Sequence, residues 1–464
     1  MTSVEELLAG LPPVRPVDPG EVTGGGHLVV LDDDPTGTQT VADVPVLTSW
    51  SVDDLRWGLR HPSRACFVLT NTRSLAAADA TARNREVLDA LVVAAEAEGV
   101  EPVVASRSDS TLRGHFPVET DALADDLARH GRPVDGVVIV PAFPDAGRIT
   151  VDSVHWARTA AGMVPAGETE FARDATFGYR SSDLREWVEE KTGGRTAAAD
   201  VLAITVADLR SGGPQHVAEL LSGVRDRQPV VVDAACDDDL RVLASALLQA
   251  ESRGTRLLYR IGPAFVRARI GQAASPPLDA AALRAYGSGH GLIAVGSHVG
   301  LTTAQHAGLP GLGGVEEFEL DVPTLLDPAS RDDHVAEVSA RAAEAMRRCD
   351  AVVRTSRTLV TGADADESLA IARTVSAALV DAVAATVRRH QPAFVVAKGG
   401  ITSSDIATEA LGIRRAITRG TLLPGIVSLW EPVAGGAAGT PYVVFPGNVG
   451  DEHALARVVG SLRS

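Results

Sequence analysis

The chain alternates short runs of valine, isoleucine and leucine with longer stretches rich in alanine, leucine and arginine. The short runs predict strands, and the longer stretches predict helices, among them 79–98, 118–129 and 364–390. This alternation is typical of parallel βαβ units, in which helices cover both faces of a sheet. The predicted strands are 28–31, 66–69, 103–105, 137–140, 230–233 and 257–260, followed by 292–295, 315–322, 351–355, 394–397 and 443–445.

A segment rich in alanine, serine, glycine and proline divides this pattern at residues 271–290. Such composition suits a connection between domains. We therefore expect an N-terminal tail (1–26), a first domain (27–270), a connection (271–290) and a second domain (291–464). The predicted fold is two Rossmann-like α/β domains whose mainly parallel sheets face each other across a cleft. The polar stretch 149–196 interrupts the alternation and is expected to be an insertion beside the site.

Composition excludes several classes of protein. The chain has 464 residues, with 43 basic and 60 acidic side chains and a formal charge of −17. Nucleic acids and anionic membranes are polyanions, so neither is expected as the main partner. The three cysteines lie far apart, which disfavours a zinc site or a disulfide framework. No signal peptide and no apolar run of roughly 18 residues is apparent, so we expect a cytoplasmic protein.

The first domain carries polar loops directly after strands, where open parallel sheets bind ligands. In the first loop Asp32, Asp33 and Asp34 follow the strand 28–31, and Thr36 and Gly37 turn the chain. Three adjacent carboxylates repel one another, so a metal ion, a basic side chain or a set of sugar hydroxyls must offset their charge. The alternative is a solvated turn in which one aspartate caps a helix.

Two further loops add arginines to this edge. The second loop holds Arg107, Asp109, Ser110, Thr111 and Arg113. An arginine can bind a carboxylate through two parallel hydrogen bonds, and aspartate and hydroxyl groups bind polyol oxygens. The alternative is an ordinary capped helix start.

The third loop, 141–149, follows the strand 137–140 and contains Arg148. A second arginine beside the site suits an anionic substrate. A surface turn with an Asp145–Arg148 ion pair is the alternative interpretation.

The second domain carries glycine, serine and threonine at its strand exits instead of charge. The three turns contain Gly296 and Ser297, the run 398–403 and the run 446–450. Small residues let backbone amides approach phosphate oxygens, and hydroxyls such as those of Thr402 and Ser403 can donate to the same oxygens. Neither the Walker A pattern nor GxGxxG occurs at these turns, so a nucleotide site of another kind is predicted.

Seven stretches together resemble the four-carbon acid sugar kinase family. They are DDPTG (33–37), DSTLRG (109–114), PAFPDAGR (141–148), YRIGPAFV (259–266), VGS (295–297), KGGITSSD (398–405) and PGNVGDE (446–452). They occur in family order over nearly the whole chain. The resemblance implies a two-domain cytoplasmic kinase of carbohydrate metabolism that phosphorylates the terminal hydroxyl of a tetronate or 3-oxo-tetronate with ATP and Mg²⁺.

The resemblance also assigns residues. The family's acidic pair falls on Asp33 and Asp34, followed by Thr36 and Gly37. Its ATP-binding positions fall on Ser297, Gly400, Ile401, Thr402, Ser403 and Gly447. The chain departs from the family at Pro35, where an aromatic is usual, and at Arg107, where a lysine is usual. Asp32 is an extra carboxylate, and Lys398 is not typical of the better-known members.

We therefore predict that Arg113, helped by Arg148, binds the substrate carboxylate and that Asp33 or Asp34 accepts the proton of the attacking hydroxyl. Thr36, Gly37, Asp109 and Ser110 complete the substrate site, with Lys398 as a further phosphate partner. The metal ligands are not assigned. The expected partners are the sugar acid and ATP, without nucleic acid or membrane, and a homo-oligomer is compatible with this prediction.

Two other functions remain open at this point. The run LDDDPTGT also fits the strand and DxDxT pattern of haloacid-dehalogenase-like phosphatases, with Asp32 as the nucleophile and Asp34 as the acid/base. A sensor that binds a sugar acid without catalysis is the second alternative. The sequence does not report which four-carbon acid is bound, because the candidates differ in the stereochemistry of one or two hydroxyls or in a carbonyl.

Overall fold

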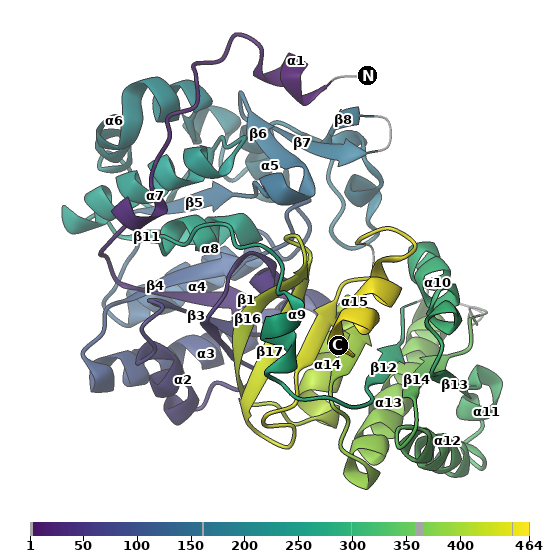
Figure 1. Ribbon diagram of the computed structural model, residues 1–464. Coiled ribbons are helices and arrows are strands. Elements are labelled where there is room, and N and C mark those ends of the chain that lie inside the picture. The colour runs from purple at the N-terminus through teal and green to yellow at the C-terminus, as the bar shows by residue number, and fades with distance from the viewer. Residues whose placement is uncertain are drawn as a thin grey trace. The chain divides into compact units, whose positions relative to one another are not determined.

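The computed structural model describes residues 3–159, 162–297, 299–357, 360, 365–447 and 449–463. The chain divides into two compact units, Met1–Ala274 (unit 1) and Ser275–Ser464 (unit 2), coloured purple to teal and green to yellow in Figure 1. Each unit is an α/β domain built on a mainly parallel sheet. The predicted fold class is therefore confirmed within each unit.

Unit 1 contains a sheet of parallel strands in which neighbours in space are seldom neighbours in sequence. In spatial order the strands are β2 (Val44–Leu47), β3 (Ala65–Leu69), β1 (His27–Asp32), β4 (Pro102–Arg107), β11 (Leu257–Ile261), β5 (Gly136–Val140), β10 (Gln228–Val232) and β9 (Leu202–Ile204). Because parallel strands all end at one edge, the loops that follow β1, β3, β4, β5 and β11 are neighbours.

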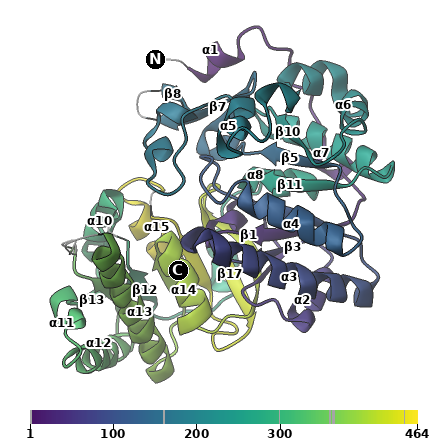
Figure 2. The same cartoon turned by 180° about the vertical axis from the view of Figure 1, so that it is seen from behind.

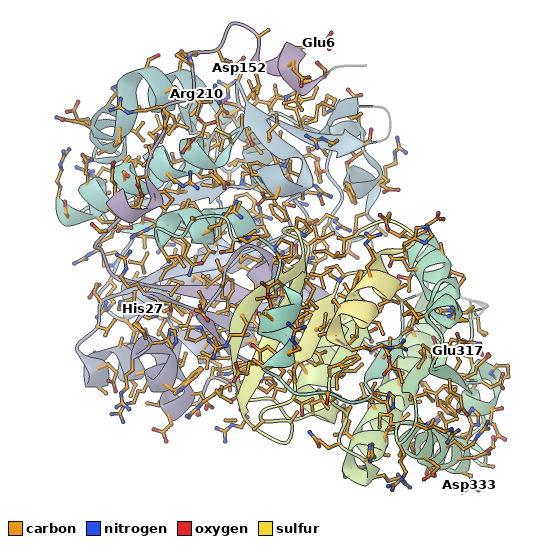
Figure 3. The ribbon with its side chains drawn as sticks, viewed as in Figure 1. Glu6, His27, Asp152, Arg210, Glu317 and Asp333 are labelled. Atoms are coloured by element: carbon orange, nitrogen blue, oxygen red, sulfur yellow. The ribbon has the colours of Figure 1, made fainter. Side chains whose placement is uncertain are left out.

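Helices cover both faces of this sheet. The strand β1, which begins at His27 (Figure 3), is buried along its whole length, as expected of a central parallel strand. On one face α2 (Val52–Leu59), α3 (Ala77–Glu98) and α4 (Val118–Arg129) lie side by side (Figure 2). On the other face Tyr259 of β11 contacts Phe265 of α8 (Pro263–Arg269). The helix α7 (Asp237–Ser252) packs against α8, and α6 (Gly213–Leu221) packs against α7.

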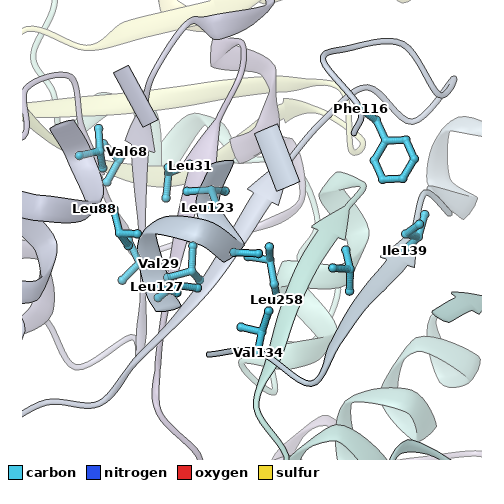
Figure 4. Close-up of a cluster of buried hydrophobic side chains, with 14 of the residues drawn as sticks. Val29, Leu31, Val68, Leu88, Phe116, Leu123, Leu127, Val134, Ile139 and Leu258 are labelled. Atoms are coloured by element: carbon cyan, nitrogen blue, oxygen red, sulfur yellow. The ribbon is translucent and has the colours of Figure 1, made fainter. Parts of the chain in front are cut away.

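The core of unit 1 consists mostly of aliphatic side chains, since the sequence has few aromatic residues. Figure 4 shows the cluster beneath α3 and α4, where Val29 and Leu31 of β1 lie beside Leu88 and Leu123. The helix α3 ends where Gly99 takes a left-handed conformation, with φ of 63°, that glycine adopts without strain.

A three-stranded antiparallel arm follows β5 and corresponds to the predicted insertion. It consists of β6 (Arg148–Val151), β7 (Val154–Thr159) and β8 (Gly162–Pro165), and α5 (Leu184–Lys191) comes after it. The carboxylate of Asp233 accepts hydrogen bonds from the backbone amides of Asp152 (2.8 Å) and Ser153 (2.9 Å) at the turn between β6 and β7. Asp152 is labelled in Figure 3.

The N-terminal segment also packs on this arm. The short helix α1 (Val4–Leu8) and Leu11 contribute side chains to a small apolar cluster with Ile149 and Met163. Residues 4–11 are thus part of the packed unit, although the sequence predicted only a tail there.

The strands of unit 2 are parallel, followed by an antiparallel pair. In spatial order the strands are β13 (Val315–Leu320), β14 (Asp350–Thr355), β12 (Leu292–Val295), β15 (Val395–Lys398), β18 (Tyr442–Phe445), β17 (Val427–Ala434) and β16 (Arg415–Leu423). The pairs from β13 to β18 are parallel, whereas β17 is antiparallel to both β18 and β16.

The hairpin of β16 and β17 was missed by the sequence analysis. Its strands contain Arg419, Gly420 and Pro432, which interrupt the apolar runs used to predict strands, and their pairing has register irregularities. A similar difference occurs at β13, which ends at Leu320 because α11 (Val322–Leu326) begins where the strand was expected to continue.

The helices of unit 2 are α9 (Ala280–Arg284), α10 (Gly300–Ala307), α11, α12 (Arg331–Ala345), α13 (Ala365–Arg389), α14 (Gly400–Asp405) and α15 (Ala454–Leu462). The helix α9 lies in the predicted connection, and its Leu283 is buried in the core of unit 2. Within α13, Ala370–Arg389 is long and apolar enough to cross a membrane by length and composition, which was not expected. One such helix is weak support for a membrane span, and α13 packs against α12 and β14.

Candidate active site

The acidic run of unit 1 lies at the carboxyl end of the central strand β1. Asp32 is the last residue of β1, and Asp34 caps the 3₁₀ helix Pro35–Thr40 by accepting a hydrogen bond from the backbone amide of Thr36 (2.8 Å). A Cβ atom on Gly37 would overlap with the Asp32 carboxyl group, so this position requires glycine. The helix-capping alternative is thus correct for Asp34, but this turn is almost entirely buried.

Two arginines offset the charge of the three carboxylates. Arg73 donates from Nε and Nη2 to the two oxygens of Asp33 (2.9 and 2.5 Å) and from Nη1 to Asp34 (2.7 Å). Arg107, at the end of β4, donates to Asp32 and to Asp34 (3.0 Å each). Of the three ways to offset the repulsion that the sequence allowed, basic side chains are the one observed.

The same contacts give the three carboxyl groups different proton affinities. Burial raises the pKa of Asp32 to about 8, with Arg107 opposing the shift. Burial also raises the pKa of Asp33, although Arg73 and Arg107 oppose it. Burial acts in the same direction on Asp34, but Arg73, Arg107 and Thr36 outweigh it and hold the pKa of Asp34 well below its usual range. Asp32 therefore holds a proton more readily than Asp34, which stays a carboxylate at neutral pH.

The loop after β4 forms a second cluster. Arg113 pairs with Asp109 (2.6 Å) and with Asp174 (3.6 Å), and its guanidinium lies over the ring of Phe171. The hydroxyl of Thr111 also donates to Asp109. Burial opposes ionisation of Asp109, but Arg73 and Arg113 outweigh it and lower its pKa to about 2. Asp174 and Phe171 come from the insertion, which therefore lies against this loop as predicted.

The insertion also holds the backbone of that loop. The Nε2 atom of His155 lies 2.7 Å from the carbonyl oxygen of Ser110, and the Tyr179 hydroxyl donates to the carbonyl of Thr111 (2.7 Å). Burial lowers the pKa of His155 to about 4, so its ring is neutral at physiological pH.

Arg148 forms no ion pair with a carboxylate among the described residues, a feature that it shares with Arg260, although Asp109 interacts with its charge at longer range. Its Nη1 donates to the carbonyl of Ala146 (2.7 Å), and its buried Nε has no partner within the described part of the chain. Asp145, proposed above as its ion-pair partner, binds Arg267 instead (2.8 Å). Burial lowers the pKa of Arg148. This guanidinium is the group at the edge best suited to an incoming anion.

Arg73 and Arg260 were missed by the sequence analysis. Arg260, on β11, is buried, donates to the carbonyl of Arg113 (3.2 Å) and lies over the rings of Phe116 and Trp187. Burial lowers its pKa to about 10. Both arginines lie at strand exits of the same edge, and this position was the available signal. Five arginines therefore lie at this edge of the sheet. Three of them were predicted from the sequence, and Arg73 and Arg260 were not.

The three glycine-containing turns of unit 2 also lie together, at the ends of the adjacent strands β12, β15 and β18. A Cβ atom on Gly447 would lie 2.9 Å from Oγ of Ser297, and one on Gly399 would lie 2.9 Å from Oγ1 of Thr402. Thr302 of α10 links two of the turns, since its hydroxyl donates to the carbonyl of Gly447 (2.9 Å). Gly400, Thr402 and the exposed Ile401, with 62% of its surface accessible, lie at the start of α14.

Two predicted phosphate partners in unit 2 have other roles. The hydroxyl of Ser403 is buried and donates to the carbonyls of Ala397 (2.8 Å) and Gly399 (2.6 Å), so it shapes the turn. The ammonium group of Lys398 is buried and donates to the carbonyls of Pro446 (2.6 Å) and Gly447 (3.3 Å). These bonds direct both donors to backbone carbonyls, and a direct phosphate contact by either side chain stays a prediction.

Across the residues that the structure describes, no group of three or more His, Cys, Asp or Glu side chains is arranged to hold a metal ion. The acidic run does not fit a preformed Mg²⁺ site, because Arg73 and Arg107 occupy its oxygens. The phosphatase alternative also disagrees with this geometry. Its nucleophile would be Asp32, which is 1% exposed and covered by Gly37.

Comparison with known proteins identifies both units. Residues 28–269 match the family model "Sugar-binding N-terminal domain", and residues 292–455 match "Nucleotide-binding C-terminal domain". The chain belongs to the four-carbon acid sugar kinase family. Unit 1 is thus the sugar-binding domain, and unit 2 is the nucleotide-binding domain. The sugar-binding model covers the Asp33–Asp34 edge, and the nucleotide-binding model covers the three glycine-containing turns.

Solved structures share the fold of this kinase-family chain. A Salmonella typhimurium LT2 protein provisionally named a tRNA synthase is 20% identical, with a TM-score of 0.67, and the match covers 93% of this chain and 98% of that one. The Haemophilus influenzae protein HI1011, of the DUF1537 family, is 18% identical, with a TM-score of 0.63 and coverage of 94% and 100%. No curated protein matches.

Proposed function

We propose that this protein is an ATP-dependent kinase that phosphorylates the terminal hydroxyl of a four-carbon acid sugar, a tetronate or 3-oxo-tetronate, to give the 4-phosphate. The observation that carries the proposal is the charge arrangement in the sugar-binding domain. There Arg148, which has no ion-pair partner and an unpaired buried Nε among the described residues, lies in the same group of strand-exit loops as a pair of carboxylates. A substrate with an acid at one end and a hydroxyl at the other fits that arrangement.

Arg148 and Arg113 are the proposed ligands of the substrate carboxylate. Arg148 has a free donor, and Arg113 can exchange its distant pairing with Asp174 (3.6 Å) for a substrate oxygen. Two guanidinium groups on one carboxylate give both charge compensation and direction. Asp109 and Ser110 of the same loop, with Thr36 and Gly37 of the neighbouring one, are the proposed partners of the substrate hydroxyls.

Asp33 is the proposed general base. A base has to gain a proton, and Asp33 has a raised pKa, whereas Asp34 is held ionised by its neighbours. Gly114, with φ of 117°, lies beside Asp33, and a Cβ atom there would be 3.3 Å from its Oδ2. A side chain at this position would therefore crowd the carboxylate of Asp33. Asp34 then keeps Thr36 and both arginines in place.

The proposed nucleotide site consists of Ser297, Gly400, Ile401, Thr402 and Gly447, with Ser403 shaping the turn. Backbone amides and hydroxyls at these strand exits suit phosphate oxygens. Mg²⁺ enters as part of the MgATP substrate, because kinases commonly bind this ion through the nucleotide phosphates. A cytoplasmic location belongs to the same proposal.

The test is ADP release by the purified protein with D-threonate, D-erythronate, L-threonate and the 3-oxo acids. We expect Asp33→Asn to lower kcat by about 10² to 10⁴, the usual contribution of a general base, with little change in ATP affinity. Asp125→Asn, an exposed carboxylate of the same unit, is the matched control.

Wild-type activity in Asp33→Asn would remove Asp33 from the mechanism. Calorimetric binding of a sugar acid without ADP release for any acid of the panel would instead favour the sensor. An inactive Asp32→Asn together with an active Asp33→Asn would support the phosphatase alternative.

A further inference from the structure

Lys398 is the last residue of β15 and one of only two lysines in the chain. Its side chain is fully buried, and its Nζ lies 2.6 Å from the carbonyl oxygen of Pro446 and 3.3 Å from that of Gly447. The same nitrogen lies 4.0 Å from the centre of the Phe445 ring. An ammonium group has three donors, so two carbonyls and a ring face satisfy it.

These bonds fasten one of the three proposed phosphate-binding turns. The carbonyl of Gly447 also accepts from Thr302, and a Cβ atom on Gly447 would lie 2.9 Å from Oγ of Ser297. The turn after β18 is therefore fixed against the turn after β12 by Thr302 and against the end of β15 by Lys398. Loss of the lysine would leave the Pro446 carbonyl without this donor and the Gly447 carbonyl with Thr302 alone, which would loosen the turn.

The positive charge of Lys398 has no carboxylate to balance it among the described residues. Burial alone accounts for the change in its pKa, and no charged neighbour contributes. The charged groups on the adjoining elements bind other partners: Asp405 of α14 accepts from Ser376, Asp451 after β18 pairs with Arg457, and His306 of α10 pairs with Glu317. The phosphates of a nucleoside triphosphate bound at these turns would supply the negative charge that the protein itself does not place beside Lys398.

We propose that Lys398 is a positioning residue of the nucleotide site, whose ammonium group holds the Pro446–Gly447 turn and couples nucleotide binding to protonation of this side chain. The inference rests on the proposed function, because it needs a nucleotide at these turns. It differs from a direct lysine–phosphate contact, since the ammonium donors point to backbone carbonyls. Lys398 acts on the phosphates in two ways: it fixes the turn that would bind them, and its positive charge attracts them without direct contact.

The expected pH dependence follows from linkage. Burial lowers the pKa of Lys398 to about 7, so the side chain loses its charge near neutral pH when no nucleotide is bound. Phosphate charges favour the protonated form and raise this pKa. Nucleotide affinity is therefore highest below about pH 7 and falls as pH rises from there to the pKa of the complex. A rise of about one pKa unit corresponds to about a tenfold loss of affinity over that range.

The decisive experiment observes the lysine itself. Protein labelled with ¹³C at lysine Cε gives two lysine signals, and Lys191→Arg identifies the signal of Lys398. We expect the Lys398 signal to titrate near pH 7 in the free protein and about one unit or more higher with a saturating non-hydrolysable ATP analogue. An ordinary lysine midpoint in the free protein, or a midpoint that bound nucleotide leaves unchanged, would overturn the proposal.

Two substitutions separate charge from geometry. Lys398→Gln keeps donors but removes the charge, and Lys398→Met removes both. We expect both to abolish the pH dependence of analogue binding, with the methionine variant weaker by about tenfold or more below pH 7. Lys191→Met is the matched control, because Lys191 in the other unit makes one hydrogen bond, to the carbonyl of Gly178 (3.2 Å).

The outcomes distinguish the two proposals. If the analogue does not bind wild-type protein at all, the proposed kinase function is wrong. If it binds and the affinity of the Lys398 variants matches that of wild type at every pH, the kinase proposal stands and the role of Lys398 is refuted.

Discussion

Arg73 offers the sharpest test of how the acidic edge is held together. This side chain makes three hydrogen bonds to two carboxylates, and Asp33 beneath it is only 2% exposed. The change to test is Arg73→Met, which keeps much of the side-chain volume and removes the guanidinium. Among the described residues, the carboxylate of Asp33 would then retain the longer contact to Arg107 (3.4 Å).

Removing one partner of a buried ion pair typically costs about 3 to 5 kcal/mol, because a charge is left without compensation. Arg107 still contacts Asp33 and Asp34, so we expect the free energy of unfolding to fall by an amount at the lower end of this range, about 3 kcal/mol at pH 8. Removing Arg73 also raises the pKa of Asp33 further. The variant then binds a proton at Asp33 more readily than wild type does, and its loss of stability should shrink as pH falls from 8 to 5.

Urea unfolding followed by tryptophan fluorescence measures this loss, since four of the five tryptophans lie in unit 1. Arg227→Met is the control, because its exposed pair with Asp125 should contribute at most about 1 kcal/mol. Arg73→Met combined with Asp33→Asn should recover part of the loss. A loss below about 1 kcal/mol at pH 8, or an equal loss at pH 5 and pH 8, would refute the reasoning.

Three further predictions concern the same edge. Asp32→Asn should keep most of the activity. It should also weaken the fall in stability that wild type shows as pH rises from about 4 to about 8, because in that range Asp32 is ionised in the unfolded chain but protonated in the folded protein; an unchanged pH dependence in thermal melts would contradict this. Gly37→Ala should destabilise unit 1 by about 1 to 3 kcal/mol, because its methyl group overlaps with Asp32; an unchanged melting temperature would contradict this. Arg148→Met should raise KM for the sugar acid about tenfold or more and leave KM for ATP unchanged, and equal effects on both constants would argue against a carboxylate ligand.

The acidic run illustrates how far residue types alone can be interpreted. Three adjacent carboxylates after a buried strand repel one another, so a group that offsets their negative charge could be predicted from the sequence. The compensating group was not predictable, because a 3₁₀ helix, a strand, an α-helix and a second strand lie between Asp33 and Arg73 in the sequence. Only the parallel pairing of β1 with β3 brings the two loops together.

The roles of individual polar groups show the same limit. Lys398 and Ser403 were reasonable phosphate partners by chemistry, yet both donate to backbone carbonyls. A sequence reports which donors exist but not which acceptors the fold places beside them. Arg148 shows the converse, because Asp145, its partner in the alternative interpretation, pairs with Arg267 and the guanidinium of Arg148 forms no ion pair among the described residues.

The sequence by itself determined the α/β class, the two domains that carry sugar-binding and nucleotide-binding family models, and the strand exits that carry the chemistry. These follow from local periodicity and from short runs of residues, which do not depend on distant contacts. The tertiary structure sets which aspartate holds a proton more readily, which one stays ionised and which arginines lack an ion-pair partner. Burial and the distances between charges set those properties, and both arise only when segments far apart in the chain pack together.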